Sequence, residues 1–323
     1  STSRVTLLLF GDVNLGRALG RELLKGNVDY PFAKMNAVFR TANEVFVNLE
    51  SPITEQNGET ESKASNFVFC APPVAAAVLK RAGVTIVSTA NNHVFDYSLR
   101  GLLETMENLR REGVRFVGTY ADSVRSVPPV IVKRNGITLG FLAYTQLLNA
   151  GGPWQGRIAV FDSIRARRDI RTLRRKSDVV IVSFHGGREY AENPDRTTLA
   201  QMHSLIDAGA DVVVGHHPHV PQGIEEYKRR LIFHSLGNLV FNQAEPWAKR
   251  SFGVELSFSR NRAHVQLASA RLIPLRAYKQ PAPDLTPSEI GELVDRTRRL
   301  SNIAVTTVND SIVVSTSQLE HFR

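Results

Sequence analysis

The sequence predicts a mixed α/β domain with a small C-terminal appendage, and three observations lead to that prediction. Short apolar runs rich in β-branched residues alternate with helical stretches, which is typical of strand–helix–strand units around a buried sheet. Other segments have the turn residues of antiparallel hairpins. The 323 residues are 42% hydrophobic and 22% charged, which is ordinary for a globular chain able to bury a sizeable core.

The strands of the strand–helix units are marked by five apolar runs, each followed by a turn or polar loop. These runs cover residues 4–10, 44–50, 83–93, 177–190 and 210–219. Helices are expected over residues 98–112, where Gly113 supplies a stop signal, and across residues 199–210.

Hairpins are expected in later segments. Asn135-Gly136 forms a strong two-residue turn signal inside residues 127–145. Residues 230–241 and 252–275 also have the pattern of strand pairs.

The C-terminal appendage begins where the chain leaves the core. Residues 270–289 are proline-rich, and a helix near residues 288–301 and a strand at 309–316 follow. We therefore predict one domain over residues 1–275, with the helix and strand of residues 276–323 packed on it.

The charge balance favours anionic partners, because the net charge is +9 and the pI is about 9.9. The densest basic run, residues 165–176, fits a solvated face of an amphipathic helix better than a nucleic-acid site, and no aromatic interleaving supports the latter. Inward-facing residues of that helix are expected to be Ile164, Ile170 and Leu173.

Cysteine content and hydropathy limit the class of protein further. Cys70 is the single cysteine, which excludes an internal disulfide and a cysteine-rich zinc site. No apolar stretch approaches the roughly 18 residues of a membrane span. The run at residues 5–10 lacks a signal-peptide cleavage site, and the start at Ser1 is what a chain trimmed of an upstream leader or anchor would show.

Polar residues with metal-binding side chains follow the predicted strands. They are Asp12 with Asn14, Asn48 and Glu50, Asn91-Asn92-His93, His185, and His217 with His219. Because loops at the carboxyl ends of strands converge in α/β folds, these side chains can meet in a mixed nitrogen and oxygen site suited to Mn, Fe or Zn. Taken singly, each has a plain structural alternative: Asp12 as a helix cap, Asn91-Asn92 as a turn, His185 as a hydrogen-bonded core residue.

The order of these blocks resembles the calcineurin-like metallophosphatase superfamily, and more closely the capsule poly-gamma-glutamate biosynthesis protein family CapA, also called PgsA. The matching stretches are "GDVNLGR" (11–17), "FVNLESPIT" (46–54), "ANNHVFDY" (90–97), "FHGGREY" (184–190), "GADVVVGHHPHVPQG" (209–223) and "HSLGNLVF" (234–241). Departures from the superfamily pattern are Asn14 in place of a histidine, Glu50 in place of a bridging aspartate, Asn91 in place of a glycine, and Gly186 in place of the usual tryptophan.

The resemblance implies a metallophosphatase-like sandwich of two mixed β-sheets flanked by helices, holding two divalent cations, Mn, Fe or Zn. Glu50 would bridge the two. One site would add Asp12 and His219, with Asn14 as a further candidate ligand. The other would add Asn92, His185 and His217. A bridging hydroxide would attack a phosphoester.

The resemblance also implies roles beside the metals. His93 would be the general acid, oriented by Asp96. Arg17, Arg188 and Asn238 would contact substrate or shape its pocket, although both arginines could instead form ordinary salt bridges. Glu189 is a candidate partner for orienting Arg188, and His216 is expected to support the site or pack.

The expected function is a metal-dependent hydrolase, most simply a phosphoesterase, associated with poly-gamma-glutamate capsule biosynthesis. Two alternatives stay open: a non-hydrolytic component of polymer synthesis or export that binds a polyanionic chain, and an amide hydrolase on the same centre. Expected partners are an anionic small molecule or polymer and membrane-bound capsule synthesis proteins, without nucleic acid. Location is left open, since relatives are often membrane-anchored and face outside the cytoplasm.

Overall fold

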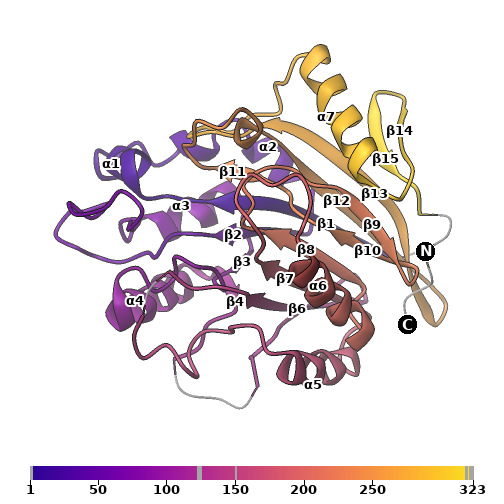
Figure 1. Ribbon diagram of the computed structural model, residues 1–323, viewed down its shortest axis with the longest axis horizontal. Coiled ribbons are helices and arrows are strands. Elements are labelled where there is room, and N and C mark those ends of the chain that lie inside the picture. The colour runs from indigo at the N-terminus through magenta and orange to yellow at the C-terminus, as the bar shows by residue number, and fades with distance from the viewer. Residues whose placement is uncertain (1–2, 122–125, 150, 317–318, 320–323) are drawn as a thin grey trace.

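Two mixed β-sheets pack against each other in this computed structural model, which describes residues 3–121, 126–149, 151–316 and 319, so Ser1 lies outside the described residues (Figure 1). The nine-stranded sheet runs in the order β14 (Val305–Val308), β15 (Ser311–Val314), β13 (His264–Arg276), β12 (Arg250–Asn261), β1 (Ser3–Val13), β2 (Glu44–Leu49), β3 (Ile86–Ser88) and β4 (Arg115–Val117), with β11 (Asn238–Val240) paired to β1. The six-stranded sheet runs β5 (Val130–Arg134), β6 (Ile137–Thr145), β7 (Val179–His185), β8 (Val212–His216), β10 (Arg230–Phe233) and β9 (Ile224–Tyr227). The expected sandwich of two mixed sheets is confirmed.

Helices cover the outer faces of both sheets. The nine-stranded sheet is covered by α1 (Arg17–Leu24), α2 (Asn36–Phe39) and α3 (Ala75–Ala82), whose apolar residues form one core cluster with β1 and β2. The six-stranded sheet is covered by α5 (Ser163–Arg174) and α6 (Arg196–Ala208), while α4 (Ser98–Glu112) lies near β4 and α7 (Pro287–Leu300) near β14 (Figure 1). Short 3-10 turns lie at Tyr30–Phe32 and Pro246–Lys249.

The core between the sheets is apolar and closely packed. Phe46 of β2 stacks on Phe141 of β6 with ring centroids 5.8 Å apart and planes 8° from parallel, and both side chains are fully buried. An aromatic pair of this kind fixes the distance between the two sheets, because it fills the gap from both sides. The two sheets are thus in direct contact through the middle of β2 and β6.

Several predicted elements are confirmed. Helix α4 covers Ser98–Glu112, and Gly113 ends it with a φ of 72°, a conformation that glycine adopts without strain. The hairpin turn at Asn135 and Gly136 joins β5 to β6 with φ angles of 48° and 78°. Strands β12 and β13 pair as expected.

Two expectations were wrong. Ile164 does not face inward but is 70% exposed, because the buried stripe of α5 runs through Ala166, Ile170 and Leu173 at intervals of four and three residues. Residues 230–241 do not form a strand pair. Strand β10 pairs with β8 and β9, whereas β11 pairs with β1, so this segment carries the chain from one sheet to the other.

The C-terminal segment adds a hairpin rather than the single expected strand. Strands β14 and β15 pair with each other, and β15 also pairs with β13, so the segment extends the nine-stranded sheet. The domain boundary predicted at residue 275 stays a prediction. Among the described residues, no helix is both long and apolar enough to cross a membrane.

Candidate metal centre

The carboxyl ends of strands from both sheets bring six polar side chains together. Asp12 lies in β1, His185 ends β7, and the other four follow β2, β3 and β8 directly or within a short loop. All six are at most 7% exposed: Asp12, Glu50, Asn92, His185, His217 and His219. Parallel strands in each sheet end at the same edge, and the packing of the sheets places the two edges side by side.

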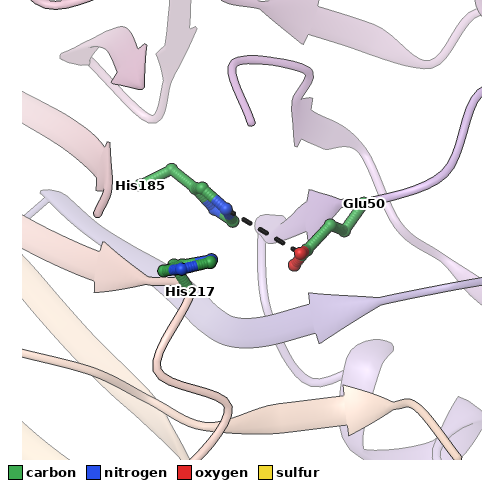
Figure 2. Close-up of side chains that lie close together, drawn as sticks. All are labelled: Glu50, His185 and His217. Atoms are coloured by element: carbon green, nitrogen blue, oxygen red, sulfur yellow. Dashed lines mark ion pairs between the residues drawn. The ribbon is translucent and has the colours of Figure 1, made fainter. Parts of the chain in front are cut away.

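Two groups of these side chains share Glu50. Ligand atoms of Asp12, Glu50 and His219 lie within 4.8 Å of one another, and so do those of Glu50, His185 and His217. Figure 2 shows the second group, with Nε2 of His185 directed at Oε1 of Glu50 over 3.8 Å. Asn92 joins it, because its Oδ1 lies 2.8 Å from His185 Nε2. This is the arrangement expected for a carboxylate between two cations.

Two ligand atoms of the cluster lack hydrogen-bond partners. Oε1 of Glu50 and Nδ1 of His217 are buried and make no hydrogen bond within the described residues. Ring nitrogens of His219 and His185 lie 3.7 and 3.8 Å from Oε1 of Glu50, and Nδ1 of His219 lies 3.0 Å from Oδ2 of Asp12. Burying a polar atom unpaired is costly, so buried polar groups are normally satisfied. Unpaired carboxylate and imidazole atoms in one buried cluster fit a divalent cation, which takes both as ligands.

Two histidines of the cluster have strained backbone conformations. His217 has a φ of 103° and His219 a φ of 62°, which are uncommon conformations for residues other than glycine. Gly11 allows β1 to lie close to the backbone of Gly237, because a Cβ at residue 11 would lie 1.8 Å from the carbonyl oxygen of Gly237. That oxygen accepts a hydrogen bond from Asp12 N. The local sequence therefore sets Asp12 beside the histidine loop.

Asparagine amides hold the expected ligands in place. Nδ2 of Asn48 donates to Oδ1 of Asp12 at 2.7 Å and to Oε2 of Glu50 at 3.2 Å. Oδ1 of Asn238 lies 2.9 Å from Nδ1 of His219, and the amide nitrogen of Asn238 donates to Gln243. Such supporting hydrogen bonds fix the orientation of metal ligands. This geometry favours a positioning role for Asn238 over the predicted contact with substrate.

Burial shifts the pKa values of the cluster in two directions, because it lowers those of two histidines and raises that of Glu50. Burial lowers the pKa of His185 well below its ordinary value, and burial followed by the charge of His219 lowers the pKa of His217 to about 3. Both rings are therefore neutral at physiological pH, with lone pairs available as ligands. Burial, and next the charge of Asp12, raises the pKa of Glu50 well above its ordinary value.

Asp12 differs from Glu50 in the sign of its shift. Burial by itself raises the pKa of Asp12, but His216 and His219 beside it hold that pKa well below its usual range. Nδ1 of His216 lies 3.5 Å from Oδ1 of Asp12, and the His216 ring is fully buried. His216 thus packs beside the cluster, as expected for a supporting residue.

His93 and Asp96 form a dyad next to the cluster. Nδ1 of His93 lies 2.7 Å from Oδ2 of Asp96, and both side chains are largely buried. Burial raises the pKa of Asp96, which the hydrogen bond to His93 partly offsets. The His93 ring stacks on Phe69 at 4.2 Å, and its Nε2 faces Nδ2 of Asn149 at 3.4 Å. The ring is held at Nδ1 by a carboxylate, whereas its Nε2 faces the neutral amide of Asn149.

Arg17 lies at the rim of the site. Its guanidinium stacks over Phe69, 4.6 Å from the ring centroid, and donates to the carbonyl oxygen of Asn66 at 2.6 Å. Arg188 is exposed, and no ion pair between it and Glu189 occurs among the described residues. Oδ1 of Asn14 accepts a hydrogen bond from Gly16 N at 2.8 Å. The substrate and ligand roles of Arg17, Arg188 and Asn14 stay predictions.

Two residues of the site escaped sequence reasoning. Asn149 donates to His93 Nε2 and accepts from Asn92 Nδ2 at 3.0 Å, although it lies in a loop without a strand-end signal. Phe69 joins His93 to Arg17 from a polar loop. Only the tertiary fold brings these loops to the cluster, so no local pattern marked them.

Comparison with known proteins shows the family. The "Capsule biosynthesis protein CapA" of Bacillus anthracis is 28% identical over 80% of this chain and 65% of its own length. The "PGA biosynthesis protein CapA" of Bacillus subtilis (strain 168) is 29% identical over 78% of this chain and 67% of its own length. The chain thus spans about two thirds of each of these relatives.

Among solved structures, the calcineurin-like phosphoesterase YfkN from Bacillus subtilis is 14% identical and covers 93% of this chain and 98% of its own, with a TM-score of 0.48. A likeness this distant says nothing about the reaction. The family model described as "Bacterial capsule synthesis protein PGA_cap", by contrast, matches residues 6–243. The CapA-type resemblance of the motifs is confirmed, and the chain belongs to the bacterial capsule synthesis protein family PGA_cap.

Proposed function

We propose that the chain is a metal-dependent hydrolase of capsule biosynthesis that cleaves a phosphoester, with His93 as general acid. The observation that carries this proposal is the His93–Asp96 dyad, held at 2.7 Å beside the orphaned ligand cluster. A metal site that only stabilised the fold would need no adjacent imidazole oriented by a buried carboxylate. The names of the Bacillus relatives support the capsule context.

Two cations would be held around Glu50, one by Asp12 and His219 and the other by Asn92, His185 and His217. When bound, divalent ions of this kind activate water near neutral pH and neutralise charge on the group under attack. Asn48 and Asn238 would keep Asp12 and His219 oriented during binding. Mn, Fe and Zn all suit this mixture of carboxylate, amide and imidazole ligands.

His93 would move the proton that the leaving oxygen needs. Asp96 accepts the Nδ1 hydrogen and fixes the tautomer, so that Nε2 is the nitrogen that gives and regains a proton. Asn149 holds the ring plane from the Nε2 side. Arg17, stacked on Phe69, can bind an anionic oxygen of the substrate with the guanidinium hydrogens not used on Asn66.

The test compares leaving groups. His93→Ala should keep its metal but lose about 10²–10⁴-fold in rate on an alkyl phosphoester, whose alkoxide must be protonated, and much less on a nitrophenyl ester. Equal losses on both substrates would make His93 a substrate-positioning residue. Metal-loaded wild type that cleaves no phosphomonoester or phosphodiester would overturn the phosphoesterase assignment.

An amide hydrolase is the second candidate, because one relative is named a "PGA biosynthesis protein", the motif resemblance implies poly-gamma-glutamate, and a centre of this kind can attack the carbonyl of an amide. Gamma-glutamyl amides therefore belong in the same screen. A metal-loaded chain inactive on esters and amides alike, yet binding poly-gamma-glutamate, would support the export alternative.

A further inference from the structure

Glu189 is a carboxylate over the histidines of the cluster that no predicted ligand set includes. A carboxylate oxygen of Glu189 and ring nitrogens of His217 and His219 all lie within 4.8 Å of one another. Unlike the other carboxylates of the cluster, Asp12 and Glu50, Glu189 is exposed to solvent. Glu189 therefore lies on the solvent-exposed side of the site, whereas Asp12 and Glu50 are buried.

The backbone holds Glu189 in that place from both sides. Gly186 N donates to the carbonyl oxygen of His216 at 2.9 Å, and Tyr190 N donates to that of Pro218 at 2.8 Å. The segment that carries Glu189 is thus tied to the loop that carries the two histidines. Gly187 turns the segment with a φ of 98°, and its N–H donates to Gln146. The proximity of Glu189 to the histidines is built into the fold.

A second observation points to a ligand at His217. Nδ1 of His217 is buried, the residue is 6% exposed, and this nitrogen makes no hydrogen bond among the described residues. The expected partner of Glu189, Arg188, makes no ion pair with it in the described part of the chain. Both the carboxylate and the imidazole are therefore available to a cation.

We propose that Glu189 is a displaceable metal ligand that covers the open side of the centre and yields its position to an anionic group of the substrate. The proposal rests on metal binding at the cluster, not on the bond that is cleaved. Because Glu189 is exposed, its carboxylate can swing into water at little cost when a competing anion arrives. The buried ligands cannot move into water in this way, so Glu189 is the ligand that an anionic group of the substrate replaces.

The test uses Co²⁺, whose visible absorption reports the number of ligands, with the full chain freed of metal beforehand. Glu189→Gln should weaken Co²⁺ binding about 10–100-fold, the range seen when a residue supporting a metal site is removed. It should also change the absorption intensity of the bound ion. Glu107→Gln, an exposed glutamate of α4, is the matched control and should bind Co²⁺ as the wild type does.

Glu189→Asp separates a ligand bond from mere attraction between charges. Aspartate keeps the charge but is one methylene shorter, and a bond of about 2.0–2.2 Å does not tolerate that retraction. If phosphate must displace Glu189 from the metal, removing that ligand should make phosphate binding tighter. The Asp and Gln variants should therefore both bind inorganic phosphate at the Co²⁺-loaded centre more tightly than the wild type does. An Asp variant that matches the wild type in both Co²⁺ and phosphate binding would overturn the proposal.

The experiment distinguishes an error in the ligand role of Glu189 from an error in the proposed hydrolase function. Wild type and Glu189→Gln binding Co²⁺ equally, with identical spectra, would remove Glu189 from the centre and leave the hydrolase intact. Wild type that binds no Co²⁺ would overturn both. Weaker binding in Glu189→Gln together with no hydrolysis by the wild type would support Glu189 as a ligand and reject the enzyme.

Discussion

Replacing Glu50 by Gln should stabilise the metal-free protein and remove most of the stabilisation that divalent metal provides. Glu50 is fully buried, and among the described residues its Oε1 makes no hydrogen bond and its Oε2 accepts from Asn48 at 3.2 Å. The carboxylate of Asp12 lies within 4.8 Å of it. The Glu50 side chain therefore lowers the free energy of unfolding when no metal is bound.

The size of the effect follows from that environment. Burial raises the pKa of Glu50 well above its ordinary value, so folding without metal either buries its charge or takes up a proton at neutral pH. The neutral amide avoids that cost, which is about 1–3 kcal/mol for an unsatisfied buried polar group. At about 2.1 cal/mol/K of unfolding entropy per residue, the Tm of this 323-residue chain should rise by roughly 1.5–4.5 °C. At a metal concentration of 100 Kd, the wild type should gain about 2.7 kcal/mol, and a hundredfold weaker variant below about 0.5 kcal/mol.

Thermal unfolding followed by circular dichroism, first with chelator and then with Mn²⁺, measures the Tm without metal and the rise in Tm that metal causes. Mass spectrometry gives the metal content of each variant. His93→Ala is the control, because it has no assigned metal bond and should keep its metal. A metal-free Glu50→Gln variant that melts below the wild type would refute the stability reasoning. Equal metal loss in both variants would place His93 among the ligands.

Two further predictions concern residues that support the cluster. Asn238→Ala should leave the circular dichroism spectrum unchanged and lower Mn²⁺ affinity about 10–100-fold in a calorimetric titration, because His219 loses its orienting partner; unchanged affinity would remove Asn238 from the support of the site. Gly11→Ala should lower the free energy of unfolding by about 3 kcal/mol or more in urea, since its Cβ would lie 1.8 Å from the carbonyl oxygen of Gly237; wild-type stability would show that β11 can move away from β1.

The sequence was sufficient to predict that the side chains at the strand ends meet. Asp12, His185 and His217 are far apart in the chain, but each stands at a strand end, and parallel strands deliver their ends to a common edge. Asn149 and the facing of Glu189 toward the histidines could not be predicted, because both depend on how loops lie after the sheets have packed.

The fold shows the same limit. The pattern of residues 230–241 indicates two short strands, and both exist, but local pattern does not tell which sheet each strand joins. Ile164 was assigned to the buried face from its apolar character, whereas the helical spacing of Ala166, Ile170 and Leu173 excludes it. Helical spacing is a better guide to the buried face than apolar character, and the strand partners are decided by packing.

Anomalous diffraction from crystals soaked in Mn²⁺ tests the central claim most directly, because it locates the metal without relying on activity. Two peaks flanking the carboxylate of Glu50 are predicted, one beside Asp12 and His219 and the other beside Asn92, His185 and His217. Crystals with no anomalous peak within bonding distance of Glu50 under saturating Mn²⁺ would contradict a metal centre at this cluster, and with it the proposed hydrolase.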